Sequence, residues 1–334
     1  MSVLAFLALV SAQLATQTPL PPPIIDMHLH AYKMSEFGPE PPELCIDPHK
    51  MTMEGLDPKN PVELKALIGN CGKPLKAPGT DAVLLSETLK VLRNRNIIAV
   101  TSGGLDDVTK WQAAAPDRII PAMHFFSGEG APKSEYAAEL RKLVGAGKIA
   151  VFAEISAQYR GLAPNHPSLE PFFALAEELD IPVGIHMGNG APAGPYWLYP
   201  KYRASLGNPL LLEDVLIKHP KMRLYVMHAG LPMQDEMLAL LYSHPQVYVD
   251  ISAENIGPRK EFHRVLRRFV EAGYGKRVMF GSDQMVWPEV IELAIESIES
   301  ADFLTEEQKR DILYNNAARF LRLTPAQISR HHGK

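Results

Sequence analysis

The chain has 334 residues, 46% of them hydrophobic and 22% charged, with a formal net charge of −4 at pH 7. This composition is typical of a globular protein with a sizeable core, whether in one large domain or two smaller ones. It contains no block of basic residues that would indicate a nucleic-acid partner, and no run of 18 apolar residues that would predict a transmembrane helix. A small-molecule ligand and a homo-oligomer remain compatible with it.

The first 20 residues have features of an export signal. Residues 3–10 are apolar, the sequence Val10-Ser11-Ala12 suits signal peptidase, and the first charged side chain is Asp26. The basic segment that usually begins a signal peptide is missing. We expect residues 1–20 to be a leader and the protein to be secreted or periplasmic; a mis-assigned start, with a cytoplasmic protein, is the alternative.

Residues 24–30, with the sequence IIDMHLH, predict a short buried strand that carries two histidines. The prolines at positions 21–23 prevent a helix from running into this strand. Because side chains alternate between the two faces of a strand, His28 and His30 point the same way. Two imidazoles on one face supply half of a metal site, although a single His-x-His pair also occurs by chance.

A long stretch rich in proline and glycine follows, from His30 to about Gly79. A loop of this length inside a compact domain is usually functional, often as a lid, and a solvated insertion without a role is the alternative. Cys45 and Cys71 lie 26 positions apart within it. If the chain is exported, we expect these two cysteines to form a disulfide.

From residue 80 onward the sequence predicts a regular alternation of helices and strands. The strands are continuously apolar, as expected when both faces are buried. After residues 24–30, they are expected at 97–100, 119–125, 149–155, 182–186, 222–228, 247–250 and 278–282. Helices are expected at 80–94, 106–115, 134–146, 170–179, 210–218, 232–243, 259–272, 289–298 and 305–321. This order favours an α/β fold, a single (β/α)8 TIM barrel over residues 21–325 with a long loop inserted after its first strand, and a C-terminal tail over 326–334.

Residues of metal-ligand type stand at the ends of five of these strands. The carboxyl ends of all strands in a (β/α)8 barrel meet at one mouth, where the chemistry of such enzymes takes place. Taken singly, His186 or His228 could be a core histidine, and Asp283 could cap the next helix. Their shared position instead predicts one metal centre, formed by His28, His30, Glu154, His186, His228 and Asp283.

Taken in order, these strand ends resemble the amidohydrolase superfamily, in particular the amidohydrolase-related (amidohydrolase 2) branch. The resemblance covers residues 24–321 and is carried by DMHLH at 26–30, IH at 185–186, MHAG at 227–230, FGSD at 280–283 and NNAARF at 315–320. It implies that His28, His30 and Asp283 bind a first metal. In binuclear members His186 and His228 bind a second one, whereas in mononuclear members His186 joins the first metal and His228 contacts substrate.

The fourth strand bears on this choice through Glu154. By resemblance, this residue corresponds to the bridging glutamate of binuclear, deoxyribonuclease-like members. An anion between two divalent cations offsets their repulsion, although Glu154 could instead bind substrate or one metal alone. We favour two divalent metals per chain, with zinc as the expected ion and one metal as the alternative. Asp283 is the expected general base, and His228 a further catalytic residue.

The resulting hypothesis is a metal-dependent hydrolase that cleaves an ester, lactone or amide carbonyl of a small molecule with a metal-activated water. A mononuclear non-oxidative decarboxylase of an aromatic or muconate-like acid is the alternative. A non-catalytic metal or ligand binder is the third class, against which the presence of Asp283 argues. Candidate substrate contacts combine aromatic, cationic and polar side chains: His124, Gln158, Tyr159, Arg160, Asn189, Trp197, Tyr202, Arg203 and Trp287.

Overall fold

The computed structural model describes residues 20–37, 43–46, 56–61, 71–125 and 135–334. The expected leader, except for Leu20, lies outside the described residues, as do parts of the long first loop. Among the residues described, no helix has both the length and the apolar character needed to cross a bilayer.

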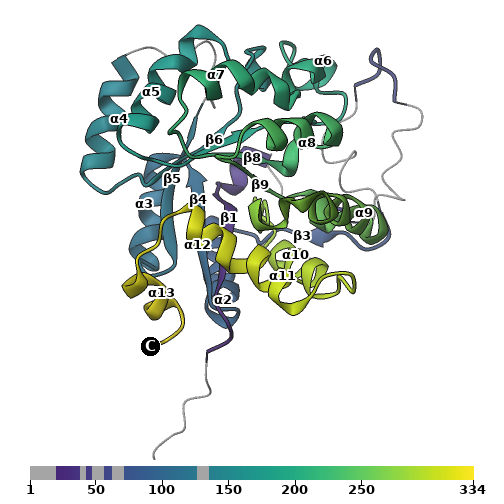
Figure 1. Ribbon diagram of the computed structural model, residues 1–334. Helices are drawn as coiled ribbons and strands as arrows, with labels where there is room; N and C mark the ends of the chain where they lie inside the picture. The colour runs from purple at the N-terminus through teal and green to yellow at the C-terminus, as the bar shows by residue number, and fades with distance from the viewer. Residues whose placement is uncertain (1–19, 38–42, 47–55, 62–70, 126–134) are drawn as a thin grey trace, which may run out of the picture.

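Eight parallel strands form a nearly closed barrel with helices around it, which confirms the predicted fold class (Figure 1). Each strand pairs with the next one in the order in which they occur in the chain. The segment just after the last strand closes the barrel against the first strand through hydrogen bonds from Met27 N to Phe280 O (2.9 Å) and from His30 N to Gln284 O (3.0 Å). The strands are β1 (Ile24–Ala31), β4 (Ile97–Gly103), β5 (Ile119–Phe125), β6 (Val151–Ile155), β7 (Val183–His186), β8 (Leu224–Met227), β9 (Val247–Asp250) and β10 (Val278–Met279).

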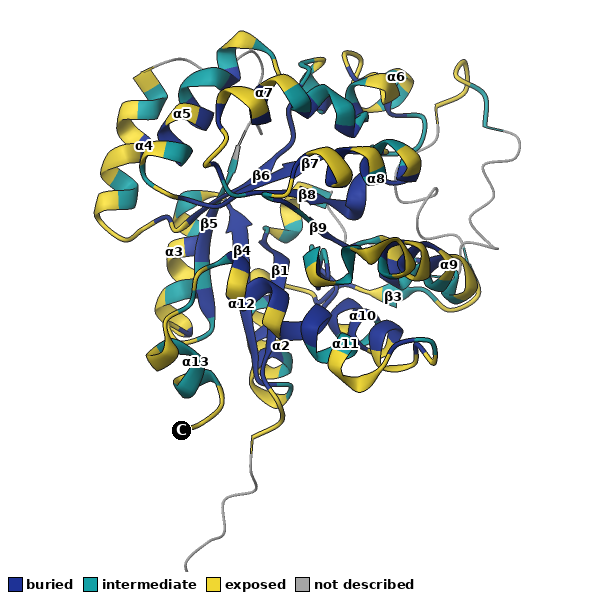
Figure 2. Cartoon of the chain, in the orientation of Figure 1, coloured by how far each residue is buried: buried dark blue, intermediate teal, exposed yellow. Residues whose placement is uncertain are grey.

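Helices separate the strands and turn their apolar faces toward the sheet, while their outer faces are exposed (Figure 2). They are α2 (Asp81–Asn94), α3 (Leu105–Ala114), α4 (Glu135–Gly145), α5 (Glu170–Glu178), the short α6 (Gly194–Trp197), α7 (Glu213–Lys218), α8 (Gln234–Ser243), α9 (Arg259–Phe269), α10 (Glu289–Glu299), α11 (Glu306–Arg310), α12 (Asn316–Phe320) and α13 (Pro325–His331). As predicted, Thr80 caps α2: its hydroxyl accepts a hydrogen bond from Val83 N at 3.2 Å.

Several predicted boundaries were wrong, each for a local reason. The expected strand 278–282 stops at Met279, because Phe280 N donates to Ile312 O and Ser282 N donates to the Asp26 side chain. The expected helix 210–218 begins with a 3-10 turn (Pro209–Leu212), and helix 232–243 begins only at Gln234. A π-helical turn over Asp311–Asn315 divides the expected helix 305–321. The expected tail contains α13, which begins with a capping box formed by Thr324 and Gln327.

Side chains from opposite strands fill the barrel interior. Tyr225 on β8 is fully buried, and its hydroxyl donates to Met27 O on β1 at 3.0 Å. Because β8 and β1 are not neighbours in the sheet, this hydrogen bond crosses the barrel. Tyr314 and Phe320 pack in the same buried cluster. The interior is therefore a packed core and not a pore.

The first loop contains a small structured unit. Strands β2 (Glu43–Leu44) and β3 (Leu75–Lys76) pair antiparallel, and Cys45 and Cys71 form a disulfide with their Cα atoms 6.0 Å apart. This confirms the expected pairing of the two cysteines. Residues 38–42, 47–55 and 62–70 of the loop lie outside the described residues, so its proposed role as a lid stays a prediction.

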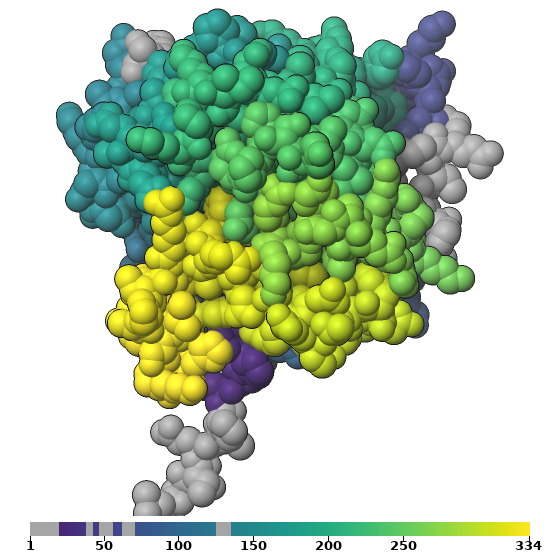
Figure 3. Space-filling view, viewed as in Figure 1, coloured from purple at the N-terminus to yellow at the C-terminus, as the bar shows by residue number. Residues whose placement is uncertain are grey.

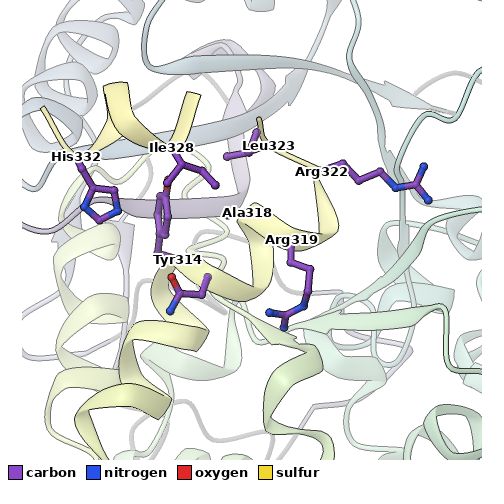
Figure 4. Close-up of a pocket in the computed structure, with 8 residues that line it drawn as sticks. Tyr314, Ala318, Arg319, Arg322, Leu323, Ile328 and His332 are labelled. Carbon is purple, nitrogen blue, oxygen red and sulfur yellow. The ribbon is translucent and has the colours of Figure 1, made fainter. Parts of the chain in front are cut away.

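A pocket of about 460 Å³ lies between the last helices (Figure 4). Its lining comes from the turn before α12, from α12, from the segment that follows it, and from α13 and its C-cap, and includes Tyr314, Arg319 and His332. None of the six predicted metal ligands lines it. The C-terminal segment that forms it lies on the molecular surface beside the start of β1 (Figure 3), where the Asn96 amide donates to both Pro21 O and His331 O.

Candidate metal centre

Four of the predicted ligands form a first group at the barrel mouth. Nε2 of His28 lies 3.1 Å from Nε2 of His30, and Oδ1 of Asp283 lies 3.1 Å from His30 and 3.4 Å from His28. Oε2 of Glu154 lies 3.7 Å from both imidazole nitrogens. Residues from three strand ends therefore meet around one point.

The other two predicted ligands form a second group with the opposite oxygen of the same glutamate. Oε1 of Glu154 lies 2.5 Å from Nδ1 of His186 and 3.9 Å from Nε2 of His228. The two imidazole nitrogens are 3.1 Å apart. The six residues that the sequence predicts thus form two adjoining groups, and Glu154 belongs to both.

The spacing of these atoms fits bound metal ions. Nitrogen and oxygen ligands at about 2.0–2.2 Å from a tetrahedral ion lie roughly 3.3–3.6 Å from one another. The atoms of the first group are separated by 3.1–3.7 Å, and their side chains are nearly all buried. Two unprotonated imidazole nitrogens at this distance would repel each other, so a cation or a proton between them is required.

Irregular backbone aims these side chains. The register between β1 and β4 shifts between Asp26 and Leu29, and the register between β6 and β7 shifts between Phe152 and Ile155. These bulges contain His28 and Glu154, and a bulge redirects the side chains of the strand in which it lies. His228 and Asp283 have positive φ angles of 56° and 53°. Such angles are uncommon outside glycine and concentrate at functional sites.

A second layer of hydrogen bonds fixes the orientation of each imidazole. The remote nitrogen of His30 contacts Ser102 Oγ at 2.9 Å, and that of His186 donates to Asn189 O at 3.0 Å. The remote nitrogens of His28 and His228 both contact Ser252 Oγ, at 2.8 and 3.1 Å. Metal-binding histidines usually have such a partner, which sets the tautomer and leaves the other nitrogen free for the ion.

The electrostatics of the site favour positive charge. Burial opposes ionisation of Glu154, but its contact with Nδ1 of His186 and the nearby imidazoles of His228 and His28 hold the pKa of its carboxyl well below the usual value. Burial also opposes the charge of Asp283, which attraction to His28 and a hydrogen bond from His30 outweigh, so its pKa is lowered. Despite its burial, His28 has a raised pKa because of Asp283 and Asp250. Ionised carboxylates among imidazoles suit divalent cations.

Some predicted substrate contacts do lie beside the centre. His124 Nδ1 is 3.1 Å from the Tyr32 hydroxyl, and burial lowers the pKa of His124 to about 4. The Tyr159 hydroxyl lies 3.4 Å from His186 Nε2, and the Tyr159 ring stacks on Tyr202 with centroids 5.7 Å apart. Asn189 takes part through its backbone carbonyl, described above.

Other predicted contacts have partners within the protein. The Arg203 guanidinium donates to Pro200 O (2.9 Å) and Tyr202 O (2.6 Å), so it supports its own loop, and its contact with a substrate stays a prediction. Trp287 packs on Phe37 with centroids 5.7 Å apart. The remaining candidates occupy nearby turns: Gln158 is buried in the 3-10 turn Ala157–Arg160, Arg160 ends that turn, and Trp197 ends α6.

Four residues of the site were not predicted. Asp250, at the end of β9, follows the same strand-end rule that identified the ligands, so the sequence contained a usable signal for it. Ser102 and Ser252 are small polar residues without a distinguishing pattern. Tyr32 stacks on His30 with centroids 4.3 Å apart and an interplanar angle of 9°. The only sequence feature that pointed to Tyr32 was its position directly after the His-x-His strand.

Most of the chain matches a known protein family. The family model Amidohydro_2, described as Amidohydrolase, matches residues 25–323. Similar solved structures include 5-carboxyvanillate decarboxylase LigW from Sphingomonas paucimobilis, with 15% identity, a TM-score of 0.58 and coverage of 91% of this chain and 100% of that one. Another is 4-oxalomesaconate hydratase LigJ from Rhodopseudomonas palustris, with 17% identity, a TM-score of 0.57 and coverage of 92% and 98%.

A third similar structure is a probable 2-pyrone-4,6-dicarboxylic acid hydrolase from Acinetobacter baumannii, with 15% identity, a TM-score of 0.55 and coverage of 90% of this chain and 99% of that one. At these identities the likeness of the solved structures shows the fold alone. No curated protein matches the chain. The family match nevertheless spans nearly the whole barrel, and the chain belongs to the Amidohydro_2 family of the amidohydrolase superfamily, as a metal-dependent enzyme.

Proposed function

We propose that this protein is a hydrolase with two divalent metals, and that it cleaves an ester, lactone or amide carbonyl of a small molecule. One observation carries the proposal: the two oxygens of Glu154 face two different groups of ligand atoms. Oε2 lies 3.7 Å from His28 and His30, whereas Oε1 lies 2.5 Å from His186. A carboxylate placed in this way can bridge two ions.

The number of donors supports the same conclusion. A catalytic zinc ion usually has three protein ligands and one open position, so six ligands exceed what one tetrahedral ion can use. We assign His28, His30 and Asp283 to the first ion, His186 and His228 to the second, and Glu154 to both. A carboxylate between the two ions offsets their mutual repulsion. Zinc suits this set of nitrogen and oxygen donors and is our expected metal.

The residues of the chain then have distinct tasks. Bound divalent cations supply Lewis acidity, which lowers the pKa of a water molecule toward neutrality and polarises a carbonyl group. Asp283, an ionised carboxylate at the mouth, would accept a proton from the attacking water and pass it to the leaving group. Tyr159 and Tyr202 form an aromatic wall beside His186, where a ring-bearing substrate would pack.

The second candidate is a mononuclear non-oxidative decarboxylase of an aromatic or muconate-like acid. The first group favours it, because His28, His30, Asp283 and Oε2 of Glu154 already have the spacing of one complete site. In that arrangement His228 would contact the substrate. Decarboxylases such as LigW share the fold at the same level of similarity as the hydrolase and the hydratase.

A substrate screen with metal-loaded protein separates these functions. Esters, lactones and amides are followed by acid release, and aromatic carboxylic acids by carbon dioxide release, with the Asp283→Asn variant as the inactive control. The hydrolase proposal requires that the wild type hydrolyses a carbonyl substrate and that the Asp283→Asn variant does not. Carbon dioxide release without any hydrolysis contradicts it and favours the decarboxylase, and metal binding with neither reaction favours a binder.

A further inference from the structure

A single hydroxyl group lies between histidines of the two metal groups. Ser252, two residues beyond the end of β9, has its Oγ 2.8 Å from Nδ1 of His28 and 3.1 Å from Nδ1 of His228. His28 belongs to the first group and His228 to the second. Ser252 itself is fully buried, so water cannot exchange freely with these hydrogen bonds.

The hydrogen bonds of Asp250 determine where the hydroxyl proton lies. Oδ1 of Asp250 accepts hydrogen bonds from the backbone N–H groups of Ser252 (2.9 Å) and His228 (3.1 Å). The same oxygen lies 2.5 Å from Ser252 Oγ. A carboxylate that already accepts hydrogen bonds from two N–H groups is ionised, so it can act only as a hydrogen-bond acceptor. The Ser252 hydroxyl therefore donates its hydrogen bond to Asp250.

The tautomers of both histidines follow from this direction. A hydroxyl group has one proton and two lone pairs. Because the proton of Ser252 is committed to Asp250, its oxygen can only accept from the imidazoles. Nδ1 of His28 and Nδ1 of His228 must therefore both carry a proton, and in the neutral rings both Nε2 atoms keep their lone pairs. These are the two atoms that face the metal groups.

The arrangement is not a nucleophilic triad. In such a triad the histidine bridges the serine and the aspartate with two different nitrogens. Here Ser252 Oγ and Asp250 Oδ2 contact the same atom, Nδ1 of His28, at 2.8 and 3.2 Å. The serine is thereby turned away from the metal-facing side of the ring and is suited to orientation instead of attack.

We propose that Ser252, held by Asp250, is a positioning residue that fixes the metal-binding tautomers of His28 and His228 together and so supports both metal subsites. This inference rests on the proposed two-metal function and adds a residue through which the two subsites depend on each other. Ser102 provides the contrast, because among the described residues its hydroxyl makes a hydrogen bond only with His30, in the first group.

The first test compares the stepwise metal affinities of Ser252→Ala and its matched control Ser102→Ala. Each variant removes one buried hydroxyl oxygen, and thermal unfolding shows that the variants remain folded. Metal-depleted protein is titrated with zinc against a chelator of known affinity. Loss of an outer-layer partner typically weakens metal binding about 10–100-fold. Ser252→Ala should weaken both binding steps, whereas Ser102→Ala should weaken one.

The two steps should not weaken equally in Ser252→Ala. His28 Nδ1 keeps a second acceptor, Asp250 Oδ2, at 3.2 Å, whereas among the described residues His228 Nδ1 keeps only the carbonyl of residue 252, at 3.4 Å. The step that involves His228 should therefore lose more. If Ser252→Ala behaves like Ser102→Ala, with one step weakened, or leaves both affinities unchanged, the proposal is wrong.

The second test needs no variant to fold. Nitrogen-15 NMR of histidine-labelled wild-type protein reports the protonated nitrogen of each ring. We expect Nδ1–H at His28 and His228, and Nε2–H at His186, whose Nε2 donates to Asn189 O. An Nε2–H tautomer at His28 or His228 overturns the inference. If the wild type binds one metal while both tautomers are as expected, the two-metal function fails and the tautomer assignment stands.

Discussion

The carboxylate of Glu154 at the end of β6 lies 2.5 Å from Nδ1 of His186 at the end of the neighbouring strand β7. Its other oxygen is directed to His28 and His30 on β1, which lies three strands away in the barrel order β1–β4–β5–β6. One side chain thus joins ligand atoms from both sides of the mouth. The predictions below follow from this arrangement and from the fold that supports it.

Replacement of Asp283 by asparagine should abolish turnover and preserve the fold. Asparagine is nearly isosteric and retains an oxygen that can coordinate weakly, but it cannot accept the proton of the attacking water. Loss of general-base catalysis alone typically lowers kcat by about 10²–10⁴-fold. The measurement is kcat together with metal content, with exposed Asp235→Asn as the control. Near-normal kcat at full metal content would assign the base to another group.

Reduction of the disulfide between Cys45 and Cys71 should destabilise the chain. The bond closes a loop with a sequence separation of 26. The loss of chain entropy in the unfolded state then stabilises the fold by roughly 3 kcal/mol. Urea unfolding of the Cys45→Ser/Cys71→Ser variant, compared with oxidised wild type, measures the difference. Two free thiols in oxidised protein, detected by intact mass, would show that the bond does not form.

Substitution of Gly184 by alanine should disturb the barrel core. A methyl group at this position on β7 would overlap the phenol ring of Tyr225, which is buried and hydrogen-bonded across the barrel. Overpacking of this kind typically costs about 1–3 kcal/mol of unfolding free energy. Gly145→Ala is the matched control, because its methyl group meets no described atom within 4 Å. Equal unfolding free energies of the two variants would show that the Tyr225 ring moves aside without loss of stability.

Removal of the Thr305 side chain should weaken the start of α11. The Thr305 hydroxyl accepts from Gln308 N at 3.2 Å, and the Gln308 side chain accepts from Thr305 N at 2.8 Å. Loss of such a cap costs about 1 kcal/mol of unfolding free energy. Thr305→Ala is compared with Thr305→Ser, which keeps the hydroxyl, in urea unfolding. A similar stability loss in both variants would assign the effect to packing of the threonine methyl group.

Much of the fold could be predicted from sequence because parallel barrel strands are continuously apolar and short turns separate them from helices. Thr80 and residues 247–250 illustrate this, since the cap and the strand are found where expected. Predicted ends of helices and strands were wrong where contacts with residues distant in the sequence outweighed the local sequence preference. The end of β10 is one case. There the Asp26 side chain accepts a hydrogen bond from Ser282 N, and the chain leaves the sheet after Met279.

The candidate ligands could be predicted because strand-end position is visible in the sequence, and the structure brings all six together. Their partners could not be predicted in the same way. Ser252 and Ser102 act through one oxygen each, at distances of 2.8–3.1 Å that depend on the final barrel geometry. Arg203 was predicted as a substrate contact because of its charge. In the structure its guanidinium donates to the carbonyl groups of Pro200 and Tyr202, which the sequence did not indicate, and its contact with a substrate stays a prediction.

Metal content per chain in the wild type and in Glu154→Gln tests the central claim most directly. A neutral amide cannot offset the repulsion between two cations, so the variant should lose the second metal first. Exposed Glu178→Gln is the matched control. Elemental analysis after removal of loosely bound metal should give two metals per chain in the wild type and in Glu178→Gln, and one in Glu154→Gln. One metal per chain in the wild type, unchanged in Glu154→Gln, would contradict the account.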